Sequence, residues 1–326
     1  MKLSARPRSA TEGLLGSTGQ PSRAPTASGR RGATIERVLG DGAVTLAAAS
    51  HPQVHWLPDP FVLMPMLVVA IVYVRRFRAV HRQAEGRRVR GAGALQAAAF
   101  AGAMLALLLA LASPIDSLGE DYLFSAHMLQ HVLLGDIAPV LLLLSLSRVL
   151  LRPVTRRLMS LERALGRFAS PLTGLALWLV LVYLWHLPPL YEAAIENPFV
   201  HLLEHVSFFT AGLAVWWPLV QPVPMRRRLT GLWTVAYIGA AKFGLAALGL
   251  YLTWSGNVLF EYYEGVPRIW GLDAIEDQNA GGAIMMVEQS LTFVIALVVL
   301  FARMLSQSEA DELRRERLED AAAAGS

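Results

Sequence analysis

The sequence predicts an all-α fold: a polytopic membrane helical bundle of seven transmembrane helices, with the N-terminus outside and the C-terminus cytoplasmic. Three observations support this prediction. The 326 residues are 54% hydrophobic and only 17% charged. The apolar residues gather in runs of about twenty, the length that a helix needs to cross a bilayer. Arginines concentrate in alternate connectors between these runs. Because a chain in lipid must satisfy its own backbone hydrogen bonds, such long uniform runs favour helices over barrel strands.

Seven apolar segments meet the length requirement, and polar connectors separate them. The segments are residues 58–76, 92–113, 122–147, 171–190, 199–220, 231–254 and 280–304. Residues 1–57 are rich in Gly, Ser, Pro and Arg, and we expect a disordered tail with no cleaved targeting peptide. Residues 58–304 then form one membrane domain. Residues 305–326 form a charged cytoplasmic tail, in which "DELRRERLED" predicts a solvated helix turn or two.

The arginines give each segment a direction. The first, third and fifth connectors are basic, and the others are acidic or neutral. The basic connectors hold Arg75, Arg76, Arg78, Arg82, Arg87, Arg88, Arg90, Arg148, Arg152, Arg156, Arg157, Arg163, Arg167, Arg226, Arg227 and Arg228. Basic loops remain in the cytoplasm. The odd-numbered segments therefore enter from outside, the even-numbered ones exit outward, and we expect a multi-pass protein of a plasma membrane. Orientation in the bilayer also explains the net charge of +4, so we expect no nucleic-acid partner.

This topology places seven of the eight histidines towards the outer side. His127 and His131 lie in the first turns of the third segment, and His186 lies near the outer end of the fourth. His201 and His205 open the fifth segment. The other two outer histidines, His51 and His55, precede the first segment, and the remaining one, His81, is expected in the cytoplasm. Each i, i+4 pair lies on one helix face, so five imidazoles from three helices are predicted at one depth.

Five membrane histidines at one depth indicate more than helix packing. A lone histidine is readily explained as a helix-to-helix hydrogen-bond donor, but polar groups in lipid are costly and mark ion or substrate pathways. With no cysteine in the chain, a metal must rest on His, Met, Asp or Glu. The predicted metal ligands are His127, His131, His186, His201 and His205. Imidazole with thioether suits Cu(I).

Other polar and sulfur-bearing residues are also candidates for roles at or near this site. Outer-half methionines are either packing residues or extra ligands: Met64, Met66, Met128, Met285 and Met286. Glu204 and Glu288 are candidates for orienting an imidazole or for binding a harder ion. Deeper in the membrane, Asp136 and Lys242 are predicted to form an ion pair that lowers the burial cost of both.

Two further patterns receive a structural interpretation. Tryptophans near segment ends predict an interfacial belt, and they include Trp56, Trp185, Trp216, Trp217 and Trp254. The "DQNAGG" stretch at 277–282 predicts a helix start capped by Asp277 or Asn279, with small residues that permit close packing.

Three separated motifs resemble the multi-spanning CtaG family of cytochrome c oxidase assembly factors. They are "HMLQH" at 127–131, "WHLPPLYEAAIENPFVHLLEH" at 185–205 and "DQNAGGAIMM" at 277–286. The resemblance spans about 58 to 304, and it implies a role in maturing haem-copper oxidases of the respiratory chain, with copper supply as the expected chemistry. Family members continue the last motif with Trp and Pro-Gly, where this chain has "MVEQS", so the resemblance assigns no role to Glu288.

The leading hypothesis is a non-enzymatic metallochaperone that passes copper to cytochrome c oxidase subunits at the outer face. The alternative is a b-type haem protein with bis-His ligation across the bundle. A metal-dependent hydrolase with Glu204 as base ranks lower, because "HLLEH" lacks the HExxH arrangement. A copper permease also ranks lower, because a conducting path needs ligands through the whole membrane depth.

Overall fold

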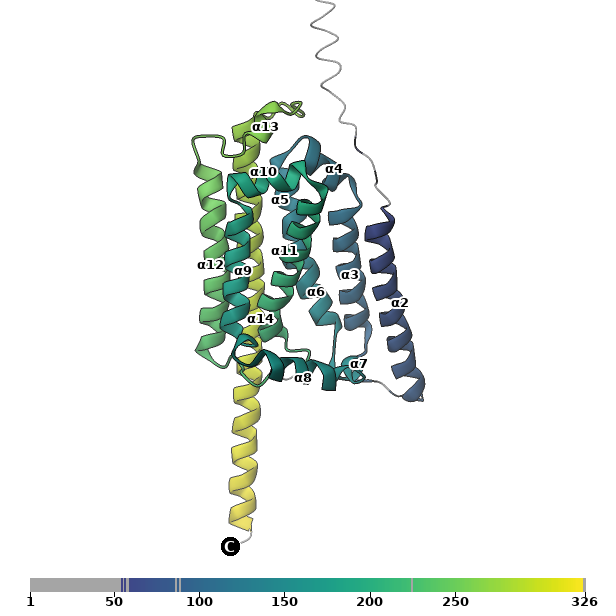
Figure 1. The fold of residues 1–326 in the computed structure, drawn as a ribbon. Helices are drawn as coiled ribbons and strands as arrows, with labels where there is room; N and C mark the ends of the chain where they lie inside the picture. Colours follow the sequence, from purple (N-terminus) through teal and green to yellow (C-terminus); the bar gives the residue numbers. More distant parts are fainter. Residues whose placement is uncertain are drawn as a thin grey trace, which may run out of the picture. The chain divides into compact units, whose positions relative to one another are not determined.

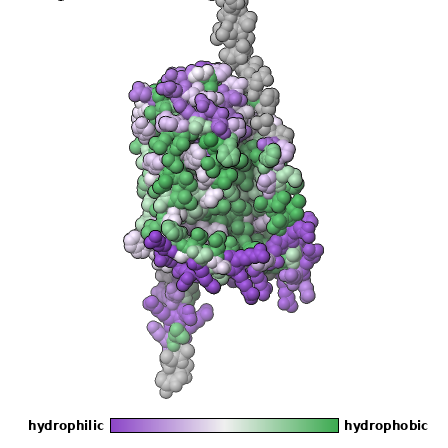
Figure 2. Space-filling view, viewed as in Figure 1, coloured by the Kyte–Doolittle hydropathy of each residue, from purple (hydrophilic) through white to green (hydrophobic). Residues whose placement is uncertain are grey.

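The structure is a computed structural model, and the part described is helical without strands, which confirms the all-α prediction. The described residues are 54, 56, 59–85, 87, 89–223 and 225–324. Six helices in this part are long and apolar enough to cross a membrane, or seven when the bent pair Thr155–Phe168 and Pro171–Trp185 counts as one span. An apolar band separates two hydrophilic ends (Figure 2). His51 and His55 lie outside the described residues.

The first two predicted segments are present with shifted ends. Helix α2 (Pro60–Gln83) begins at the cap residue Asp59 and lies at the periphery, since only two of its side chains are buried. Helix α3 (Ala94–Leu111) is followed by a short helix α4 (Pro114–Asp121) rather than by a loop. Ser113 caps α4, and a proline at its first position is preset for helix entry.

The third predicted segment is one span with an irregular centre. Helix α5 (Phe124–Val132) passes into the π-helical turn η1 (Leu133–Ile137) and then into α6 (Ala138–Ser145). Pro139 lacks an N–H, so the carbonyl of Gly135 loses its ordinary helical partner, and the turn widens there. A Cβ at Gly212 of the neighbouring span would come within 2.0 Å of that carbonyl oxygen, so only glycine permits this approach.

The connector before the fourth span is more ordered than its polar sequence indicated. It holds α7 (Arg148–Leu151), α8 (Thr155–Leu165) and the 3-10 turn η2 (Gly166–Phe168). Helix α8 runs across the ends of the spans (Figure 1) and buries none of its side chains in the protein. The fourth predicted segment, 171–190, is shorter than expected: α9 (Pro171–Trp185) ends before Pro188, and α10 (Pro188–Glu196) follows as a separate helix.

The last spans are α11 (Pro198–Val220), α12 (Leu232–Trp254) and α14 (Ala274–Ala324), with the short α13 (Tyr262–Gly265) before α14. The predicted seventh segment, 280–304, starts too late and stops too early. Asp273 accepts hydrogen bonds from the backbone N–H groups of Ile275 and Glu276 and so caps α14. Beyond Gly282 the helix contains neither Gly nor Pro, so it continues through the charged tail without a break.

The two glycines of "DQNAGG" bring three helices together, as the small residues predicted. A Cβ at Gly281 would come within 2.5 Å of the Phe124 ring on α5, and one at Gly282 within 2.5 Å of the Thr253 backbone on α12. Helix α14 therefore packs closely on both α5 and α12. This places the outer turns of α5 against α14 on one side and α11 on the other.

The arginine-rich connectors gather at one end of the bundle. The Arg76 side chain donates to the carbonyls of Val149 and Leu150, which joins the first connector to the third. The backbone N–H of Arg226 donates to Glu162, 2.7 Å away, which joins the fifth connector to α8. The alternation inferred from charge is thus reproduced in space, although the compartment facing each end remains a prediction.

Candidate metal centre

Helix α5 presents a histidine pair on one face. The Nε2 atoms of His127 and His131 are 2.9 Å apart, and both residues are buried. Asp277 of α14 holds the start of α5, because its carboxylate accepts from the backbone N–H groups of Phe124 at 2.6 Å and Ser125 at 3.1 Å. The prediction that Asp277 caps its own helix was therefore wrong: it caps a helix far away in sequence, which only the tertiary fold brings near.

Glu204 of α11 faces this pair. Its carboxylate oxygens lie 3.6 Å from His131 Nε2 and 3.9 Å from His127 Nε2, and the side chain is fully buried. Each of the three residues offers one ligand atom, and these atoms lie within 4.8 Å of one another. The glutamate that the sequence offered as an imidazole partner is thus at the centre of the cluster.

His201 and His205 lie on the same face of α11, with ring centroids 4.0 Å apart and ring planes inclined at 55°. His201 is 5.5 Å from His127, and His205 is 5.8 Å from His131, by ring centroids. The Nδ1 of His201 is 2.8 Å from the carboxylate of Glu120 on α4. Because a carboxylate can only accept, the neutral ring carries its proton on Nδ1 and turns a bare Nε2 into the protein. A carboxylate that orients a histidine in this way is common behind metal ligands.

His186 lies at the edge of the cluster. It follows α9 as the C-cap, and its ring centroid is 6.2 Å from that of His131. Its Nε2 is 3.4 Å from the sulfur of Met128 rather than close to Glu204. The structure thus brings all five predicted histidines together. His127 and His131 form an inner group with Glu204, and His186 lies at the edge of the cluster. The assignment of the five histidines as metal ligands stays a prediction.

Two tyrosines lie beside the cluster. The Tyr191 ring of α10 lies 5.1 Å from the His127 ring. The Tyr263 hydroxyl donates to the Gly119 carbonyl at 2.6 Å, so Tyr191 must donate to Tyr263 across 3.1 Å. Burial raises the pKa of both hydroxyls, which keeps them neutral donors. The sequence pattern does not single out these tyrosines or Glu120, because aromatic and acidic residues in short connectors have no distinctive spacing.

The cluster contains an unusual number of polar atoms without partners. Buried atoms of the described chain that lack a hydrogen bond include His131 Nδ1, His201 Nε2, His205 Nε2 and both Glu204 oxygens. An unsatisfied buried polar group costs about 1–3 kcal/mol. Imidazole nitrogens and a carboxylate that converge in this way can together bind a cation, and a cation would satisfy several of them at once.

A second polar cluster lies deeper in the bundle and includes Asp136 on the π-helical turn. The predicted ion pair with Lys242 is confirmed, and Asp136 also accepts from the indole of Trp216 and from Gln289. The prediction that Trp216 anchors the interface was therefore wrong. Trp185 is also buried, and its indole N–H donates to the hydroxyl of Ser207. A buried indole N–H needs an acceptor inside the protein, and both tryptophans have one. Glu288 bonds to Gln289 rather than to a histidine.

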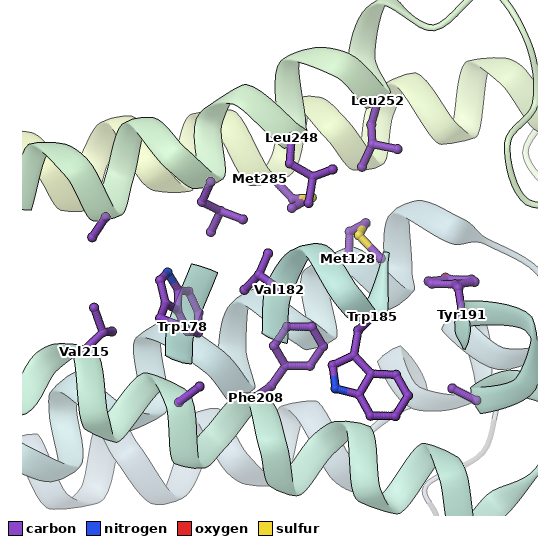
Figure 3. Packing of buried hydrophobic residues seen from close by; sticks show 14 of the residues in the cluster. Met128, Trp178, Val182, Trp185, Tyr191, Phe208, Val215, Leu248, Leu252 and Met285 are labelled. Atoms are coloured by element: carbon purple, nitrogen blue, oxygen red, sulfur yellow. The ribbon is translucent and has the colours of Figure 1, made fainter. Parts of the chain in front are cut away.

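The methionines that the sequence offers as extra ligands differ in their distance from the histidine cluster. Met128 and Met285 are buried in the hydrophobic core (Figure 3), and both line a cavity with His131 and His186. Met64 on α2 is 57% exposed, which leaves it outside the cluster. Met66 packs against the α3 side of the bundle, and Met286 faces Thr253 of α12. Packing explains these two without a ligand role.

Comparisons with known proteins agree with the motifs. The model of the cytochrome c oxidase caa3 assembly factor family matches residues 71–307. An uncharacterized protein of Mycobacterium leprae is 26% identical over 294 residues, and one of Mycobacterium bovis is 27% identical over 290. Each match covers 81% of this chain but 42% of the relative, so the chain spans about two fifths of their length. No solved structure matches the chain.

Proposed function

We propose that this chain, which belongs to the cytochrome c oxidase caa3 assembly factor family, holds copper in its histidine cluster and delivers it to subunits of the oxidase. Family membership favours a non-catalytic role in oxidase assembly. One observation carries the finer proposal: His127, His131 and Glu204 offer buried ligand atoms within 4.8 Å of one another. Copper is the cargo in this account, not a resident cofactor.

The donor set suits an ion that must later be released. Imidazole is a good ligand for copper, and the chain has no thiolate that would bind the ion more tightly. A buried carboxylate at Glu204 compensates the charge of the ion in a region of low dielectric constant. Neutral imidazoles lose the metal when they are protonated, so a change in their surroundings can release it.

The direction of delivery follows from the arginines. The cluster lies towards the end of the spans opposite the arginine-rich connectors, which we assign to the cytoplasm. The cluster then faces the extracytoplasmic side of the plasma membrane. His201 and the partly exposed Glu120 are the part of the cluster nearest to solvent, and we assign the route for copper to this side.

Bis-His haem remains the alternative cofactor, and the packing favours an ion over it. The imidazoles contact one another directly, and the cavity beside His131 and His186 has a volume of about 20 Å³. A porphyrin needs far more space between its axial ligands. The purified protein should therefore show no Soret band, whereas a strong Soret band would favour haem.

The function can be tested in cells that make the oxidase. A strain without this protein is complemented with the wild type, with the double variant His127→Ala and His131→Ala, or with His81→Ala at the opposite end of the bundle. The copper content of the purified oxidase, per haem, should be restored by the wild type and by His81→Ala only. A fully metallated oxidase from cells carrying the double variant would contradict copper delivery by this cluster.

A further inference from the structure

The contact between His186 and Met128 is chemically unusual. The Nδ1 of His186 is 2.8 Å from the carbonyl oxygen of Val182. A carbonyl only accepts, so the neutral imidazole must carry its proton on Nδ1. Its Nε2 then presents a lone pair to the thioether sulfur of Met128, 3.4 Å away. Both residues are buried, and no hydrogen lies between these two electron-rich atoms.

This pair borders a cavity of about 20 Å³, enough for one water-sized occupant. Its lining includes Met128, His131, His186 and Met285, and Figure 3 shows both methionines among the surrounding apolar side chains. Met128 packs closely on Gly281 of α14, where an added Cβ would come within 3.1 Å of its Cγ. The two methionines and the imidazole therefore line one small space.

We propose that His186, Met128 and Met285, together with the shared His131, form a second, soft metal site that takes Cu(I) from the His127, His131 and Glu204 group. Metal bonds of about 2.0 Å to nitrogen and 2.3 Å to sulfur, combined with the observed 3.4 Å separation, give an angle of about 105° at the ion. That angle suits trigonal or tetrahedral coordination and leaves room for the Met285 sulfur. Thioethers select Cu(I) over harder ions.

His131 links the two sites. It belongs to the inner group with Glu204, and it also lines the cavity beside His186. One ion can therefore pass from a site with a carboxylate to a site of sulfur and imidazole without leaving the protein. The sites share this residue, so each chain carries one ion at a time. The carboxylate site accepts several cations, and the soft site retains only Cu(I).

The proposal rests on copper being the cargo, and its test does not depend on oxidase assembly. Purified protein is loaded with Cu(I) alone, and X-ray absorption measures the atoms around copper. The wild type should show sulfur at about 2.3 Å. The double variant Met128→Leu and Met285→Leu, which nearly conserves volume, should lose sulfur scattering while copper stays on nitrogen and oxygen. Met64→Leu on α2 is the matched control and should resemble the wild type, and thermal melting verifies that all variants fold.

Two outcomes overturn the soft site: copper in the wild type with only nitrogen and oxygen neighbours, or undiminished sulfur scattering in the double variant Met128→Leu and Met285→Leu. The proposed function fails independently. If copper shows sulfur neighbours but the oxidase is metallated normally without this protein, the soft site stands and delivery is wrong. If the oxidase needs the histidines but copper has no sulfur neighbour, delivery stands and the soft site is wrong.

Discussion

The bundle contains two buried polar clusters, and they differ in how their polar atoms are satisfied. In the deeper cluster, Asp136 accepts from Lys242, Trp216 and Gln289, so opposite charges meet inside the protein. In the histidine cluster near the end of the bundle, His127 and His131 face Glu204, and several imidazole nitrogens and both Glu204 oxygens have no hydrogen-bond partner. The ion pair of the deeper cluster is made by the chain itself, whereas the histidine cluster is left open for a cation.

The comparison explains why similar residue types serve different ends. A matched ion pair between α12 and the π-helical turn locks two spans, and it needs no ligand. Convergent imidazoles without partners cost stability in the free protein and regain it when an ion binds. Substitutions in the Asp136 cluster should therefore change the free energy of unfolding, and substitutions in the histidine cluster should change metal binding.

The largest effect is expected from Lys242→Met. Without the ammonium, Asp136 is left as a buried charge, which costs about 3–5 kcal/mol in the free energy of unfolding. Thermal unfolding in detergent measures this loss. Adding Asp136→Leu to Lys242→Met removes the orphan charge and should recover most of the stability, and a double variant as unstable as the single one would contradict the ion-pair account.

Glu204→Gln should have the opposite effect: it should weaken copper binding and leave the stability of the metal-free protein unchanged. The amide keeps the shape of the side chain but removes the charge that compensates a bound cation. We expect the copper affinity to fall about 100-fold while the metal-free protein melts no lower than the wild type. Competition against a copper chelator measures the affinity. A variant that loses stability and keeps its affinity would place Glu204 with the structural residues instead.

Gly212→Ala tests the close contact between α11 and the π-helical turn that carries Asp136. The new Cβ would come within 2.0 Å of the Gly135 carbonyl oxygen, so the π-helical turn must shift. Overpacking of this kind costs about 1–3 kcal/mol of unfolding free energy. Gly256→Ala is the control, because nothing lies within 4 Å of its Cβ. Equal melting temperatures for the two variants would show that this close contact is unimportant.

The smallest effect is expected from Glu120→Gln. Its pair with His201 is partly exposed, so the loss of stability should be below about 1 kcal/mol. Because the carboxylate orients the His201 ring, copper affinity should fall about 10-fold. Isothermal titration of the variant beside the wild type measures both the affinity and the stoichiometry. An unchanged affinity would remove His201 from the ligand set.

Much of the fold could be predicted from the sequence, because lipid imposes a length and an apolar pattern on each span. The i, i+4 spacing placed His127 beside His131, and the cost of burial paired Asp136 with Lys242. The sequence does not predict α8 within its Arg-rich connector, since the charges obscure its amphipathic pattern. For the tail it predicts only a helix turn or two, whereas α14 continues through that stretch, which lacks helix breakers.

The remaining errors concern contacts between distant segments. Asp277 caps α5, and the Trp216 indole donates a hydrogen bond to Asp136. The tertiary fold, and not local spacing, brings these partners together. The division of the five histidines was hidden for the same reason. A common depth in the membrane does not say which ring meets Glu204 and which meets Met128.

Copper bound per chain tests the central claim most directly. Purified wild-type protein, loaded with Cu(I) and freed of excess metal, should retain about one copper per chain by elemental analysis. His81→Ala should match it, and the double variant His127→Ala and His131→Ala should retain almost none while still unfolding in one cooperative thermal transition. Undiminished copper in the double variant would contradict the assignment of the metal site to this cluster.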